Sequence, residues 1–316
     1  MNKLKSYLYH LKAFDLIVVI FYALLTLLNV IFCFKIQVWE YLALFNLLTV
    51  FIAFLIPFFE TKYENKFWKI VHYVYIAPLI LFTFKELHYL IRPIRGHDYD
   101  WLFIKIDHFI FGANPTQILY HISSPALTEL LQIVYSSFYL LPLILALVLL
   151  RKRRFLACDY AVFSVIYGFY LSYVGYFMLP GIGPRFTLYN FANLDKELPG
   201  LFFTHFLRYM IDIGESIPNH AANPANYVQR DVFPSGHTMM TLIVMYLSVK
   251  LRDKSKYFFV PWGFLLIFAT VYLRYHYFVD LIGGFLFMAF SIWTGKYIFN
   301  WWRKTTGHEE FTYENS

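Results

Sequence analysis

The stretch "FLLIFATVYLRYHYFVDLIGGFLFMAF", residues 264–290, joins two long apolar runs through a short polar link. The runs extend over residues 257–274 and 279–300, and about 20 apolar residues cross a bilayer as a helix. Three ionisable side chains, Arg274, His276 and Asp280, stand in the link. Because such groups are costly at membrane depth, they usually face the interior of a helix bundle in pairs. The stretch predicts a helical membrane protein with a functional centre at one end of these helices.

The composition of the whole chain agrees with a membrane protein. Of its 316 residues, 59% are hydrophobic and 15% are charged, whereas about 25% are charged in an average soluble protein. Six more apolar runs lie at residues 14–36, 41–59, 68–91, 128–150, 157–179 and 237–251. The sequence therefore predicts an all-α, polytopic fold with about eight transmembrane helices.

Clusters of basic residues predict the orientation of these helices. They precede the first run or follow runs two, four, six and eight: Lys3, Lys5, Lys12, Lys62, Lys66, Arg151, Lys152, Arg153, Arg154, Lys250, Arg252, Lys254, Lys256, Arg303 and Lys304. All lie on one side if the N-terminus is inside, and such loops are typical of the cytoplasmic side. This distribution accounts for the net charge of +7 without a nucleic-acid partner.

Two long polar segments then lie on the outer side. Residues 92–127 mix apolar and polar positions at helical spacing, which predicts a helix along the membrane interface. Its acidic residues Asp98, Asp100 and Asp107 are expected to be solvated or interfacial. Residues 180–236 are rich in Asn, Pro and Gly, and His220 lies in the part of this loop that would roof a site.

Three groups of polar residues meet at this outer side. "LPGIGPRF" (residues 179–186) carries Arg185, and "FPSGHT" (residues 233–238) opens the sixth run. The forked guanidinium groups of Arg185 and Arg274 suit phosphate oxygens, although Arg274 could equally anchor the chain at the interface. Ser235, Gly236 and the first helical turn after them offer backbone N–H groups to an anion. Together these groups predict a phosphate site.

The histidines supply the chemistry at such a site. Asp280 follows His276 by four residues, one helical turn, so it could orient the ring while the other ring nitrogen attacks. His237 then remains to protonate a leaving oxygen. The arrangement predicts phosphoryl transfer through a phosphohistidine. No metal or other cofactor is expected, because the arginines and the helix end neutralise the phosphate charge.

These residues resemble the motifs of the PAP2 phosphatase/phosphotransferase superfamily, whose members act on lipid phosphates and related phosphoesters. Its second motif, Pro-Ser-Gly-His, matches Pro234 to His237, and the His-x3-Asp of its third motif matches His276 and Asp280. The resemblance implies His276 as nucleophile, His237 as general acid and Asp280 as the partner of His276. It also implies a six-helix catalytic core at residues 68–302, after a transmembrane pair at 1–67 and before a cytoplasmic tail at 303–316.

The first motif of that superfamily, Lys-x6-Arg-Pro, is spelled by "KELHYLIRP" (Lys85 to Pro93), which lies one pair of helices too early. "GPR" occupies the expected place, so Arg185 is the candidate and the family lysine is replaced by Met178. Lys85 and Arg92 remain further candidates to supply the charge.

The third motif departs from the family as well, because Thr270 stands where the family has an arginine six residues before the histidine. Arg274 is predicted to take over, one turn further along the same helical face. Two similarities point to different branches. "ATVYLRYHYFVDLIGG" and "DHFIFGANPT" are similar to fungal inositol phosphorylceramide synthases, which transfer a phospho-headgroup between lipids, whereas "FPSGHT" is similar to the phosphatases.

Three functions therefore stay open. The first is hydrolysis of a lipid phosphate or diphosphate in phospholipid metabolism. The second is transfer to a lipid alcohol, such as the sphingolipid ceramide, which requires that water be excluded. The third is a lipid or anion transporter, which the absence of an internal repeat disfavours. Membrane lipids are the expected partners, and the expected location is a bacterial inner membrane with both termini cytoplasmic and the active site periplasmic.

Overall fold

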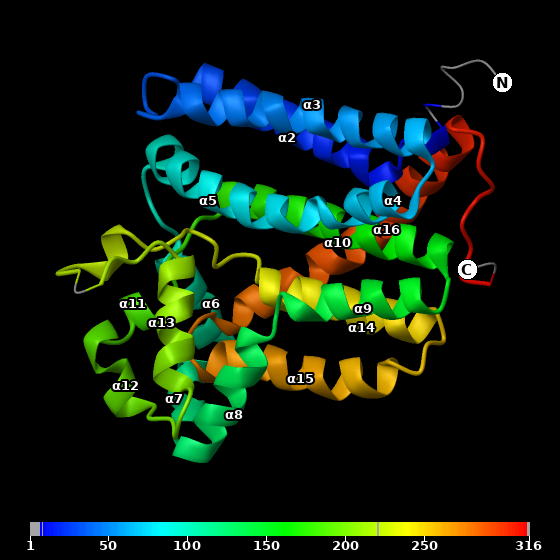
Figure 1. Cartoon of the computed structure of the whole chain (residues 1–316). Coiled ribbons are helices and arrows are strands. Elements are labelled where there is room, and N and C mark those ends of the chain that lie inside the picture. The colour runs from blue at the N-terminus through cyan, green and yellow to red at the C-terminus, as the bar shows by residue number, and fades with distance from the viewer. Residues whose placement is uncertain (1–6, 8, 220, 315–316) are drawn as a thin grey trace. The chain divides into compact units, whose positions relative to one another are not determined.

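The computed structural model describes residues 7, 9–219 and 221–314. In these ranges the chain forms α-helices and two short 3-10 helices, with no strand, as Figure 1 shows. The predicted all-α class is therefore confirmed. Lys3, Lys5 and His220, which entered the predictions of orientation and of a loop over the site, lie outside the described residues.

Each of the eight apolar runs is helical. The helices are α2 (Ala13–Ile31), α3 (Trp39–Tyr63), α4 (Lys66–Val74), α5 (Ile76–Arg95), α8 (Pro125–Ser136), α9 (Leu140–Arg151), α10 (Phe155–Met178), α14 (Gly236–Lys250), α15 (Lys256–Tyr272) and α16 (Phe278–Thr305). The third run is divided between α4 and α5, and the fourth between α8 and α9, which meet at 56°. Five of the described helical segments are long and apolar enough to cross a membrane, or six with α8 and α9 counted together. The chain is thus a polytopic membrane protein.

The polar segments between these helices carry shorter elements. Helices α6 (Asp100–Phe111) and α7 (Pro115–Tyr120) occupy the segment predicted to be helical, and Pro115 begins α7 at a position where its missing N–H costs nothing. The second segment holds α11 (Pro184–Thr187), η1 (Phe191–Asn193), α12 (Leu194–Glu197), α13 (Thr204–Gly214) and η2 (Pro224–Asn226). These elements supply several of the side chains that surround the site.

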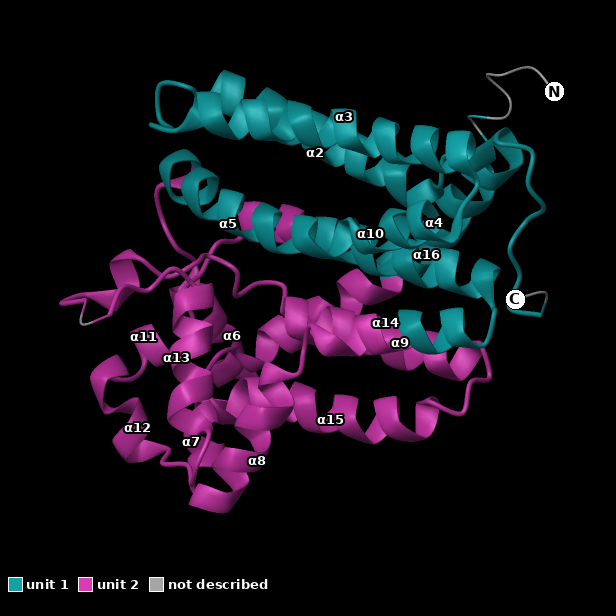
Figure 2. Cartoon of the chain, in the orientation of Figure 1, with its two compact units in different colours: residues 1–94, 146–170, 290–316 teal, residues 95–145, 171–289 magenta. Residues whose placement is uncertain are grey.

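The chain divides into two compact units, coloured separately in Figure 2. Unit 1 comprises residues 1–94, 146–170 and 290–316, and unit 2 comprises residues 95–145 and 171–289. Helices α5, α9, α10 and α16 each contribute residues to both units. The boundaries at residues 67 and 302 stay predictions.

Two apolar clusters of unit 2 hold the link between α15 and α16. The first joins α8, α12 and α15 through Leu131, Tyr135, Leu194, Leu198, Ala269, Tyr272, Leu273 and Tyr275. The second joins α6 to the link through Phe103, Val232, Tyr277 and Val279. Tyr275 and Tyr277 flank His276 and belong to different clusters, so the link is packed from two sides. Burying each such side chain contributes roughly 1.5–3 kcal/mol, and the position of His276 is fixed as a consequence.

Candidate active site

The segment that carries His276 is a tight non-helical link between α15 and α16. Arg274 has a φ of 65°, in the left-handed region, and therefore ends the helical path. The N–H groups of Tyr275 and His276 both donate to the carbonyl of Thr270, each at 3.0 Å. The expectation that Arg274 continues a helical face, and that His276 and Asp280 are one turn apart on one helix, is therefore wrong. The link between the two helices folds back and so brings His276 next to Asp280.

His276 contacts a carbonyl and a carboxylate on one side and His237 on the other. Its Nδ1 lies 3.1 Å from the carbonyl oxygen of Val232 and 3.4 Å from Oδ2 of Asp280. Its Nε2 lies 3.4 Å from Nδ1 of His237. Since a carbonyl only accepts, Nδ1 is assigned the proton and Nε2 the lone pair. The attacking nitrogen of the sequence hypothesis thus faces the second histidine.

The protonation state of His276 follows from its surroundings. The residue is 3% exposed. Burial, aided by the positive charge of Arg185 and opposed by the bond to Val232, lowers the pKa of His276 to about 3. Its imidazole is therefore neutral near pH 7, which is the form that has a lone pair to attack phosphorus.

Asp280 is fully buried at the start of α16. Its Oδ2 accepts the N–H of Tyr277 at 2.7 Å, while its Oδ1 has no hydrogen-bond partner among the described residues. A buried carboxylate oxygen without a partner is costly. Asp280 is consequently suited to a positive charge that develops on His276.

His237 is half-buried in the first turn of α14, between two aromatic rings. The ring of Tyr135 stacks on it with centroids 4.4 Å apart and planes at 20°, and the ring of Phe138 lies at 4.2 Å. These contacts orient the imidazole toward His276. Both rings belong to the α8–α9 region, so the bend between these helices helps to shape the site.

Ser235 and Gly236 join the starts of α14 and α16. Ser235 caps α14, because its Oγ accepts the N–H of Thr238 at 3.2 Å, and its own N–H donates to the carbonyl of Asp280 at 2.9 Å. A Cβ at Gly284 would lie 2.8 Å from the carbonyl oxygen of Ser235, so only glycine permits this approach. A Cβ at Gly236 would collide with the hydroxyl of Tyr176. The phosphate-binding roles of Ser235 and Gly236 stay predictions.

Arg185 lies beside the link that carries His276 and binds two carboxyl groups. It is 2% exposed, and its central carbon lies 4.6 Å from the ring centre of Tyr275. One guanidinium nitrogen donates to Asp212 at 2.9 Å and another donates to Glu215. Both carboxylates come from α13 and its C-terminal cap. The predicted phosphate ligand is thus positioned near His276 with two carboxyl groups already bound to it.

Arg274 holds a different carboxylate. It pairs with Glu197 of α12, and its central carbon lies 3.5 Å from the ring centre of Tyr189. Its Nε is buried without a hydrogen-bond partner among the described residues. Because Arg274 is only 1% exposed, the alternative of an interfacial anchor that reaches into solvent does not fit its surroundings.

The remaining candidates, Lys85 and Arg92, lie in α5 of unit 1, whereas the residues above lie in unit 2. Their part in the site stays a prediction. In the ranges that the structure describes, no group of three or more His, Cys, Asp or Glu side chains is arranged to hold a metal ion.

Several acidic residues around the site were not predicted from the sequence. Asp100 and Asp107 are 6% and 1% exposed, so the expectation that they are solvated or interfacial is wrong. They accept N–H groups from the loop before Arg185 and from the start of α16. Their spacing of seven residues on a helix, which places them on one face, is the signal that could have found them. Asp212 and Glu215, three apart, share a face in the same way.

Comparisons with known proteins show the family of this chain. The PAP2 superfamily matches residues 103–294, which is more than half of the chain. A PA-phosphatase related-family protein of Dictyostelium discoideum is 26% identical over 148 residues, which cover 46% of this chain and 24% of that protein. The chain therefore aligns with about a quarter of that relative. No solved structure matches the chain. The residues matched to the superfamily contain both histidines and Asp280, and the chain belongs to the PAP2 superfamily.

Proposed function

We propose that this chain is a lipid phosphatase that forms a phosphohistidine at His276. The observation that carries the proposal is the row formed by Asp280, His276 and His237, with separations of 3.4 Å on each side of the central ring. A nucleophile, the group that stabilises its charge and a proton donor are thereby aligned. Membership in the PAP2 superfamily supports a phosphatase or phosphotransferase.

In the first step, the lone pair on Nε2 of His276 attacks the phosphorus of the lipid phosphate. The bond between phosphorus and the lipid oxygen breaks, and His237 passes a proton from the substrate phosphate to that oxygen. The proton on Nδ1 of His276 stays directed at Val232 and Asp280, whose negative charge stabilises the imidazolium. In the second step, His237 takes a proton from water, the water oxygen bonds to phosphorus, and the bond between phosphorus and nitrogen breaks to release phosphate.

Arg185 would bind the phosphate oxygens during both steps. Its nitrogens now donate to Asp212 and Glu215, so the phosphate must displace or share these carboxylates. Burial raises the pKa of Glu215 against the opposing charge of Arg185, which makes protonation and release of this carboxyl easier. Arg185 is then free to use its forked donors on phosphate.

A second candidate function is transfer of a phospho-headgroup to a lipid alcohol, as in inositol phosphorylceramide synthases. The observation in its favour is that His276 is only 3% exposed. A site that excludes water protects a phosphoenzyme from hydrolysis and suits a lipid acceptor. For either function we propose an active site on the outer membrane face, periplasmic in a bacterium, with both termini inside.

The test uses the purified chain in detergent with a panel of lipid monophosphates and diphosphates. Phosphate release above a His276→Ala blank is the expected result, and the panel ranks the headgroups. If no phosphate is released, a phosphoinositol or phosphoethanolamine lipid and a lipid alcohol are supplied, and formation of the exchanged lipid would establish transfer. A folded sample that does neither would overturn the proposed enzyme.

A further inference from the structure

Helix α6 carries two buried carboxylates that take no part in the steps of the proposed reaction. Asp100 and Asp107 stand at its start and two turns later, on one face. Burying a carboxylate costs several kcal/mol unless hydrogen bonds satisfy it. Both are satisfied mainly by backbone N–H groups of two segments that carry predicted site residues. Their partners show what the two carboxylates hold in place.

Asp107 holds the first turn of α16. Its Oδ2 accepts the N–H of Phe278 at 2.8 Å, and its Oδ1 accepts the N–H of Val279 at 2.9 Å. The first N–H groups of a helix have no partner within the helix, so Asp107 serves as a cap provided by another helix. Asp280 is the next residue in the chain and faces His276. Asp107 thereby holds the segment that carries Asp280.

Asp100 holds the loop that carries Arg185. Its Oδ1 accepts the N–H of Gly183 at 2.8 Å, and its Oδ2 accepts the N–H of Ile182 at 3.0 Å. The hydroxyl of Tyr277 donates to the same carboxylate at 2.9 Å. Asp100 thus holds the loop two residues before Arg185 and the link one residue after His276.

The loop and the link also touch each other. Gly183 has a φ of 94°, and a Cβ there would lie 2.8 Å from the carbonyl oxygen of Tyr275. The N–H of Arg185 donates to the carbonyl of Arg274 at 3.2 Å. A small shift of either segment would therefore change the distance between the guanidinium and the catalytic ring.

We propose that Asp100 and Asp107 are positioning residues that set the distance between the phosphate ligand Arg185 and the nucleophile His276. The inference rests on the proposed function and assigns each carboxylate a separate effect. Asp107 sets the position of the nucleophile and its carboxylate partner, and Asp100 sets the position of the phosphate ligand. A misplacement of about 1 Å can cost about 100-fold in rate, so these contacts matter although neither residue touches the substrate.

An Asp107→Asn substitution tests the first effect. The amide has one acceptor oxygen, so one of the two N–H groups loses its partner and meets an NH₂ group instead. We expect kcat to fall by about 10- to 100-fold, with KM unchanged because Arg185 keeps its place. Should this variant fail to fold, Asp107→Glu keeps the carboxylate but moves it by one methylene group, and is measured in its place.

An Asp100→Asn substitution tests the second effect. The loop before Arg185 loses part of its anchor, so phosphate binding weakens. We expect KM for the lipid phosphate and the inhibition constant of orthovanadate each to rise by about tenfold, the effect of about one charge-assisted hydrogen bond, with a smaller change in kcat. A fall in kcat for Asp107→Asn together with a rise in KM for Asp100→Asn is a result that general loss of stability would not produce.

The matched control is Asp253→Asn. Asp253 is also buried, at 3% exposure, and accepts a backbone N–H, that of Ser255, at 2.8 Å. It lies between the end of α14 and the start of α15, at the ends opposite to Ser235 and His276, about 20 Å away for helices of this length. Its substitution should lower the melting temperature without separating KM from kcat.

The outcomes separate this inference from the proposed function. If wild-type protein turns over lipid and His276→Ala does not, but both α6 variants lose activity only in step with their melting temperature, the positioning roles are wrong. If no lipid is turned over, thermal stabilisation by orthovanadate still reports on the phosphate site, and an Asp100→Asn variant stabilised as much as wild type overturns the role of Asp100. Wild-type protein that neither turns over lipid nor binds orthovanadate overturns both proposals.

Discussion

Each compact unit contains a buried histidine beside carboxylates, and the two histidines differ in what their nitrogens contact. In unit 1, Nδ1 of His72 lies 2.5 Å from Glu60, and its Nε2 lies 2.8 Å from Asp15. In unit 2, Nδ1 of His276 contacts Val232 and Asp280, but the one partner of its Nε2 in the described part of the chain is His237, at 3.4 Å. His72 therefore has no nitrogen left to react, whereas His276 has one.

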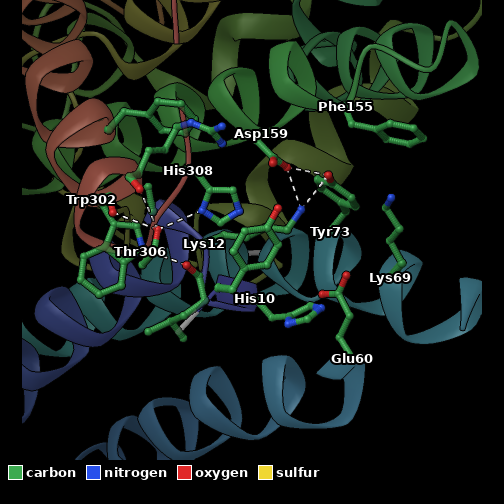
Figure 3. A pocket seen from close by; sticks show the side chains of 15 residues that line it. His10, Lys12, Glu60, Lys69, Tyr73, Phe155, Asp159, Trp302, Thr306 and His308 are labelled. Carbon is green, nitrogen blue, oxygen red and sulfur yellow. Dashed lines mark hydrogen bonds and ion pairs between the residues drawn. The ribbon is translucent and has the colours of Figure 1, made fainter. Parts of the chain in front are cut away.

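Tyr73, the next residue in the chain after His72, belongs to a second set of polar groups in unit 1. A cavity of about 260 Å³ in unit 1, shown in Figure 3, is lined by Lys12, Tyr73 and Asp159 among others. Lys12 donates to Asp159 and to the hydroxyl of Tyr73, both at 2.7 Å, and that hydroxyl donates to Asp159 at 2.5 Å. These polar groups satisfy one another. We infer that a buried histidine beside a carboxylate is a catalytic candidate only when one of its ring nitrogens lacks a strong hydrogen-bond partner.

The largest expected effect is that of His276→Ala. Removal of the nucleophile should lower turnover by at least about 1000-fold, because the proposed reaction proceeds through a bond between phosphorus and Nε2 of His276. Among the described residues the ring makes one hydrogen bond shorter than 3.4 Å, so the melting temperature should fall by the modest cost of that bond and of the small cavity left behind. Turnover and circular dichroism of the same preparation check this. Retained turnover would remove His276 from the mechanism.

His237→Ala should have the next largest effect. Loss of a general acid costs about 100- to 10,000-fold, and the loss should be greatest for lipid alcohols, which are poor leaving groups. A nitrophenyl phosphate, whose leaving group needs no proton, should lose much less. Rates on the two substrate types check this, and an equal loss on both would show that His237 acts in another way.

The counterpart substitution in unit 1 is His72→Ala. The substitution leaves the carboxylates of Asp15 and Glu60 buried without their shared partner, and breaking a buried ion pair costs about 3–5 kcal/mol. Stability should fall accordingly, while kcat per folded molecule stays unchanged. Thermal unfolding and active-site titration measure the two quantities. A fall in kcat of the folded fraction would show that His72, like His276, contributes to turnover.

The pH dependence of stability should carry a contribution from His276. Its pKa is about 3 in the folded chain and about 6.5 when unfolded. The unfolded chain thus binds more protons between these values. The contribution is complete above about pH 6.5 and is lost toward pH 3, by about 1.4 kcal/mol per pH unit. Unfolding of wild type and His276→Gln between pH 7 and 5 checks this, and equal slopes would contradict it.

The smallest expected effect is that of Ser235→Ala. As a helix cap, Ser235 should contribute about 1 kcal/mol to stability, and its loss should leave KM nearly unchanged. A rise in KM of tenfold or more would instead support the predicted contact with phosphate. Steady-state kinetics together with thermal unfolding distinguish the two roles.

Much of the fold could be predicted because hydropathy acts locally along the chain. All eight apolar runs are helices, although the breaks within the third and fourth runs were not anticipated. Glu86, 2% exposed in α5, shows the limit of such reasoning. It accepts amide N–H groups from Asn29 and Asn46 at 2.8 Å, and partners 57 and 40 residues away leave no local pattern in the sequence.

The sequence alone determined the helical membrane class and singled out His237, His276 and Asp280, because a run of apolar residues and a short motif are complete within a few turns of chain. The folded chain alone shows that Asp100 and Asp107 are buried and accept backbone N–H groups. It alone also shows that Arg185 binds Asp212 and Glu215. The physical reason is that a hydrogen bond or ion pair depends on distance in space. Segments far apart in the chain must fold together before a buried carboxylate has a partner.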